Sequence, residues 1–115
     1  MTISERSVGG VTILDIDGQL TIGAASGHLR DKVRSVLQQG QKRLVLNLAG
    51  VHYVDSGGLG EMVQAYATTK TQGGALKLVN TTKRLHDLLV ITKLSTVFDT
   101  FDTEAAAIAS FGASE

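Results

Sequence analysis

The sequence predicts a small α/β layer fold built on a mixed β-sheet, and three observations lead to this fold class. Strand-type and helix-type hydrophobic patterns alternate along the chain, with two strand-type runs at the start. A Gly-Gly pair at positions 9–10 separates those two runs, which is typical of a β-hairpin. Each later strand follows a helix, and such connections give parallel strands with right-handed crossovers. The 115 residues are expected to form one domain, residues 1–115.

The predicted hairpin comes first. Residues 3–8 are expected to form a short edge strand, and residues 11–20 a second strand. In the second strand Leu14 and Ile16 alternate with two aspartates, which is the period-two pattern of a half-buried strand.

A helix and a central strand follow the hairpin. The helix is indicated by apolar residues at i, i+4, i+7 and i+8, namely Leu29, Val33, Val36 and Leu37. It is expected to end at Gly40, because glycine suits a left-handed cap. Residues 43–48 are nearly all apolar, as expected of a central strand that is covered on both faces.

The rest of the chain repeats this alternation. A second helix is expected from the turn at Ser56 to about Lys70, before Gly73-Gly74, and residues 75–79 form the next strand. Thr81 or Thr82 can cap a third helix. Residues 97–101 are expected to form a last edge strand, followed by a C-terminal helix with Ala105, Ile108 and Phe111 on one side. The prediction is thus a mixed four- to five-stranded sheet with about four helices.

The composition excludes several classes of function. Eleven basic and eleven acidic residues balance, which disfavours a nucleic-acid-binding surface. Most of the five aromatic residues fall inside apolar patterns and are interpreted as core. There is no cysteine, so disulfides, thiolate metal sites and thiol catalysis are excluded. No apolar run approaches the length of a membrane span, so no membrane insertion is expected, and a cytoplasmic protein is the simplest interpretation.

The most informative segment is Val-Asp-Ser-Gly-Gly-Leu-Gly at positions 54–60, because it places a hydroxyl at a strand-to-helix turn. The first amides of a helix lack backbone partners, and together with the helix dipole they favour negative charge. Ser56 is therefore a candidate to carry a phosphate. The alternative is that Asp55 or Ser56 is simply an N-cap with no further role.

Other chemistry is weaker. The segment lacks the lysine and spacing of a phosphate-binding loop, and Ser56 has no G-x-S-x-G elbow around it. His52 and Asp55 lie close to Ser56 in sequence, but a catalytic triad gathers its members from separate elements, so an enzyme is disfavoured. His28 and His86 have no ligand partner at i+4, so no metal or other cofactor is expected.

At Asp-Ser-Gly-Gly-Leu-Gly, positions 55–60, the sequence resembles the anti-sigma-factor antagonists, the stand-alone STAS domains of bacterial partner-switching systems. Their phosphorylation loop reads D-S-x-G-[LI]-G, with the serine as acceptor. The flanks agree in order and spacing: 45–48 with 51–54, 72–78, and 85–98 resemble the family's strand before the loop, its next strand, and its third helix with the last strand. The resemblance covers about residues 3–111 and implies a STAS-like fold.

The resemblance implies a regulatory role and no enzymatic activity. The unphosphorylated protein would bind a GHKL-type serine kinase that is also an anti-sigma factor, releasing a sigma factor for transcription. That kinase would use ATP and magnesium to phosphorylate Ser56, and a metal-dependent serine phosphatase would reset the cycle. Asp55 would shape the partner-binding loop, which also includes Leu59, and Gly57, Gly58 and Gly60 would allow close approach of the kinase.

Two departures from the family pattern bear on the partner. Family members often carry G-E-[LI]-D at the end of the second strand, where this chain has Gln19 and Thr21 in place of the carboxylates. The stretch 22–28 is about one residue longer than usual and lacks the customary proline. The main alternative is a non-switching STAS module that serves as a structural subunit of a transport or envelope-lipid assembly.

Overall fold

The computed structural model describes residues 2–21 and 28–111, and its centre is a five-stranded sheet in the order β1-β2-β3-β4-β5. The strands are β1 Thr2–Val8, β2 Val11–Leu20, β3 Arg43–Val54, β4 Ala75–Val79 and β5 Thr100–Phe101. β1 is antiparallel to β2, and every later pair of neighbours is parallel. The predicted hairpin and the predicted parallel strands are both confirmed.

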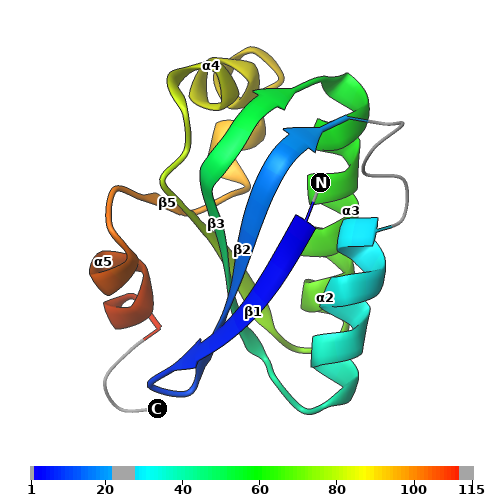
Figure 1. Cartoon of the computed structure of the whole chain (residues 1–115), viewed down its shortest axis with the longest axis vertical. Coiled ribbons are helices and arrows are strands. Elements are labelled where there is room, and N and C mark those ends of the chain that lie inside the picture. Colours follow the sequence, from blue (N-terminus) through cyan, green and yellow to red (C-terminus); the bar gives the residue numbers. More distant parts are fainter. Residues whose placement is uncertain (1, 22–27, 112–115) are drawn as a thin grey trace.

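Helices lie on both faces of this sheet (Figure 1). α2 His28–Gln38 and α3 Ser56–Thr71 cover one face, and α5 Glu104–Ala109 lies against the other. α4 Lys83–Ile91 lies beyond the carboxyl ends of the central strands, and the short 3₁₀ helix η1 Leu94–Thr96 follows it. The four α-helices of the described residues match the number expected. None of these helices has the length and apolar character that a membrane crossing requires.

The strand periodicity divides the core into two layers. Leu14 and Leu46 face α2 and α3 in the larger layer, while their neighbours Ile13 and Val45 face α5 in the smaller one. All four side chains are fully buried. β3 is therefore covered on both faces, as its apolar run predicted.

Short sequence signals predicted where two of the helices begin or end. α2 ends at Gln38, two residues before the predicted end at Gly40, and Gly40 has the left-handed backbone that the sequence predicted, with φ +91°. Of the two threonines proposed as caps, Thr82 is the one that accepts a hydrogen bond, from the Leu85 N–H at 3.2 Å.

Three details of the prediction were wrong. β3 continues six residues past 48 to Val54, because its pairing with β2 survives two register shifts. The strand expected at 97–101 is only Thr100–Phe101, since the Val97 and Phe98 amides instead donate to the Leu94 carbonyl. In α5 the buried alanine is Ala107, whereas Ala105 is exposed.

A polar network joins the N-terminal hairpin to α5. Arg6 on β1 pairs with Asp15 on β2 and with Glu104 on α5, the latter at 2.6 Å. Asn47 on β3 donates to the Asp15 carboxylate at 2.7 Å. The hydrogen bond from Arg6 holds the pKa of Asp15 below its usual range, because it stabilises the charged carboxylate.

Candidate functional site

The connection between β3 and α3 is fixed by Asp55. Its backbone is extended, with φ −112°, and its side-chain Oδ1 accepts a hydrogen bond from the Gly58 N–H at 2.8 Å. Its own N–H donates to the Leu20 carbonyl at 3.3 Å, which holds the end of β2 against the loop. Asp55 is therefore the N-cap of α3, and Ser56 occupies the first helical position without serving as the cap.

Gly58 packs against the backbone of β2. A Cβ atom at this position would lie 1.7 Å from the Leu20 carbonyl oxygen, so no side chain fits there. Leu59, the next residue, is 5% exposed and belongs to the larger core layer. The sequence placed both residues in the partner-facing loop. In the structure both residues are buried and support the loop from beneath, and their part in partner binding stays a prediction.

Ser56 lies at the surface of this loop. The residue is exposed, and within residues 2–21 and 28–111 its hydroxyl has no hydrogen-bond partner. α3 is 16 residues long and carries no acidic side chain in its first turn, so the Asp55 cap is the carboxylate that an anion at this positive end would meet. One turn further, Gly60 is exposed, and a Cβ built on it would meet nothing within 4 Å. The site offers an accessible nucleophile for modification on a surface that another chain can approach closely.

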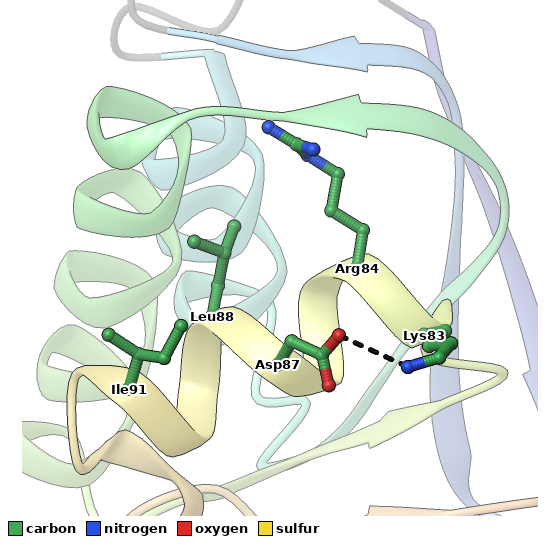
Figure 2. A pocket seen from close by; sticks show the side chains of 5 residues that line it. All are labelled: Lys83, Arg84, Asp87, Leu88 and Ile91. Atoms are coloured by element: carbon green, nitrogen blue, oxygen red, sulfur yellow. Dashed lines mark hydrogen bonds and ion pairs between the residues drawn. The ribbon is translucent and has the colours of Figure 1, made fainter.

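A groove of about 360 Å³ lies on α4 beside this loop. It is lined by Lys83, Arg84, Asp87, Leu88 and Ile91 (Figure 2). Figure 2 shows the Arg84 side chain extending from α4 toward the end of β3. There its guanidinium carbon lies 5.3 Å from the centre of the Tyr53 ring.

Exposed apolar side chains form a surface at the end of α4, and a further one lies near the end of β3. Ile91 is 75% exposed and Val90 is 51% exposed, while Tyr53 on β3 is 41% exposed. Sequence reasoning missed these residues and counted Tyr53 among aromatics that mostly belong to the core. One signal was present: Leu88 to Ile91 are four consecutive apolar residues on one helix, and a helix cannot turn four successive side chains into one core.

The other residues singled out from the sequence lie apart. His52 is exposed on β3 and shares no hydrogen bond with Asp55 or Ser56. The Asp55 carboxylate instead accepts the capping hydrogen bond from the Gly58 N–H. His28 and His86 are exposed at separate helices. In the described parts of the chain, no group of three or more histidine or acidic side chains is placed to hold a metal ion.

The departures from the family pattern border the site. Gln19 is exposed and pairs in register with Tyr53, so this neutral side chain stands beside the loop. Thr21 follows the end of β2 and is half-buried. Residues 22–27, where the sequence is longer than usual, lie outside the described residues.

Comparison with known proteins gives one consistent result. A model of the STAS domain family matches residues 2–107. The anti-sigma-B factor antagonist of Bacillus subtilis (strain 168) is 38% identical over 86 residues, which cover 75% of this chain and 77% of that protein. The anti-sigma F factor antagonist of Paenibacillus polymyxa is 27% identical over 104 residues, covering 86% and 85% of the two chains.

The fold agrees with a solved structure. A Thermotoga maritima protein proposed to be an anti-sigma factor antagonist superimposes with a TM-score of 0.85 and 25% identity, covering 94% of this chain and 92% of that one. Family match, relatives and architecture all agree. The chain therefore belongs to the STAS domain family, among the anti-sigma factor antagonists.

Proposed function

We propose that this protein is a phosphorylation-controlled anti-sigma factor antagonist. Unphosphorylated, it binds an anti-sigma factor that is also a GHKL-type serine kinase, so that the sigma factor is set free for transcription. The kinase supplies ATP and magnesium and phosphorylates Ser56, after which the complex dissociates. A metal-dependent serine phosphatase then restores the starting form. All these steps take place in the cytoplasm, and the protein itself performs no catalysis.

The observation that carries the proposal is the exposed, unpartnered Ser56 hydroxyl at the first position of α3. A kinase can reach such a hydroxyl without opening the fold. The names of the relatives support an anti-sigma factor as the partner. Asp55, Gly57 and Gly60 present the loop, and the apolar surface around Ile91 extends the face that the partner covers.

The change of charge is large enough to reverse binding. A phosphoryl group adds about −1.5 to −2 charges at neutral pH. Turning a complex from 99:1 bound to 1:99 requires about 5.5 kcal/mol of differential affinity. A dianion buried at an interface, next to the Asp55 carboxylate, provides a penalty of that order through desolvation and repulsion. In the free protein the amino end of α3 tolerates the same charge, so the fold is retained.

The proposal is tested by capture from an extract of the native cells. Wild type, Ser56→Ala and Ser56→Asp are immobilised, and Ser35→Asp serves as the matched control because Ser35 is exposed on α2. Wild type, Ser56→Ala and Ser35→Asp are expected to retain a kinase that Ser56→Asp loses. With ATP and magnesium, that kinase should label the wild type and fail to label Ser56→Ala. Equal capture by Ser56→Asp and wild type refutes the charge switch.

A further inference from the structure

Arg84 has a guanidinium with unused hydrogen-bond donors close to the Ser56 loop. Its five N–H groups make no hydrogen bond to any described residue, and its recorded contact is with the face of the Tyr53 ring, 5.3 Å away. In Figure 2 the guanidinium lies under the stretch of chain where β3 ends and leads into α3. Arg84 is thus held near the loop by a ring contact that leaves its donors available.

The neighbouring charges single out Arg84 among the basic residues of α4. Lys83 is already paired with Asp87 at 3.4 Å, one helical turn away on the outer side. The Asp55 Oδ1 accepts from the Gly58 N–H, and among the described residues this carboxylate makes no ion pair with Arg84. A phosphate on Ser56 would stand beside that carboxylate, and a cation is needed to offset the repulsion between them.

The ring that Arg84 contacts is close to Ser56 along the chain. Ser56 follows Tyr53 by three residues, which is about 10 Å of extended chain. A phosphoryl group projects beyond the serine oxygen, and a surface arginine changes rotamer within nanoseconds. To meet the phosphate, the guanidinium would leave the Tyr53 ring without any movement of the backbone.

We propose that Arg84 is the receptor, within the same chain, for the phosphate on Ser56. The planar fork of the guanidinium binds two phosphate oxygens at once, a geometry that a lysine cannot reproduce. This proposal rests on the proposed phosphorylation of Ser56. It adds a second consequence of that modification, because Arg84 also lines the α4 groove and covers Tyr53. Phosphorylation then changes the groove as well as the loop, and the partner loses both parts of its contact surface together.

The test measures the second pKa of phosphoserine at position 56, which is installed during translation by genetic code expansion and so requires no kinase. Phosphorus NMR follows the titration in wild type, Arg84→Gln and the control Arg34→Gln, since Arg34 is exposed on α2. This pKa is near 6 in a free phosphoserine, and an adjacent cation lowers it by favouring the dianion. Arg84→Gln is expected to raise it by at least about 0.3 units relative to wild type, with Arg34→Gln unchanged. No rise in Arg84→Gln, or an equal rise in Arg34→Gln, overturns the proposal.

A second measurement needs no substitution at Arg84 and compares the serine and phosphoserine forms. The Nε–Hε signal of Arg84 should shift between the serine and phosphoserine forms, while the signal of Arg34 stays in place, and an unmoved Arg84 signal also overturns the proposal. Failure of the proposed function gives a different experimental result from failure of the Arg84 proposal. If the phosphoserine protein still binds the kinase but its pKa depends on Arg84, the receptor is correct and the charge switch is wrong.

Discussion

Replacing Gly58 by alanine is the perturbation that the structure defines most sharply, because one methyl group meets the backbone of another strand. The new Cβ would lie 1.7 Å from the Leu20 carbonyl oxygen and 2.4 Å from its carbon. Backbone atoms cannot rotate away, so either the end of β2 or the first turn of α3 must move by more than 1 Å, as an order of magnitude. That movement also strains the hydrogen bond from the Asp55 N–H to the Leu20 carbonyl.

The net effect follows from three contributions to the free energy of unfolding. Overpacking costs about 1–3 kcal/mol, and a weakened hydrogen bond costs about 1 kcal/mol. Alanine in a helix returns about 1 kcal/mol relative to glycine. Gly58→Ala should therefore lose about 2 kcal/mol, which for a chain of 115 residues lowers Tm by about 8 °C.

The matched control is Gly60→Ala, two residues further in the same helix, where an added Cβ would meet nothing within 4 Å. It should gain up to about 1 kcal/mol from helix propensity alone. Urea unfolding followed by circular dichroism measures both variants against wild type. If Gly58→Ala proves as stable as Gly60→Ala, the close approach of β2 to α3 is wrong, and with it the account of how the loop is held.

Three further predictions concern the cap, the polar network and the apolar surface. Asp55→Ala should lose about 1 kcal/mol of stability and Asp55→Asn much less, as measured by urea unfolding, because asparagine also caps helices well; equal losses would contradict the capping role. Arg6 lowers the pKa of Asp15, so this pair adds stability above the unfolded pKa of about 3.9 that is lost as pH falls below it. The difference in free energy of unfolding between wild type and Arg6→Gln should therefore be constant above about pH 5 and shrink toward pH 2, and a difference that grows with acid would reverse the assignment. Ile91→Asp should change stability by less than about 0.5 kcal/mol, since the side chain is 75% exposed. The same substitution should weaken capture of the kinase. The control Val8→Asp, at an exposed valine of β1, should leave capture intact.

Much of the fold could be predicted because its signals are local. The period-two alternation around Leu14 and the apolar spacing from Leu29 to Leu37 each depend on residues within a few positions of one another. The end of β3 could not be predicted in this way. Residues up to Val54 stay in the sheet because β2 continues to pair with them across two register shifts, and such pairing is not encoded in the segment itself.

In the candidate site too, features set by neighbouring residues could be predicted, and features set by contacts between separate elements could not. The exposed Ser56 at a helix start was predictable, since a strand-type run, a capping residue and a helical pattern follow one another directly. The role of Gly58 was not, because it depends on the Leu20 carbonyl from another strand. The contact between Tyr53 and Arg84 likewise joins β3 to α4, and no spacing in the sequence brings those two residues together.

Charge at position 56 is proposed to switch the regulator between its bound and its free state. The direct measurement is the affinity of the captured kinase, by calorimetry, for two forms of the chain that differ only in serine or phosphoserine at that position. The predicted result is that phosphorylation lowers the affinity by at least about a thousandfold, while the circular dichroism spectra of the two forms stay identical. A thousandfold loss corresponds to about 4 kcal/mol of binding free energy. Equal affinities for the two forms, or a phosphoserine form that has lost its fold, would contradict it.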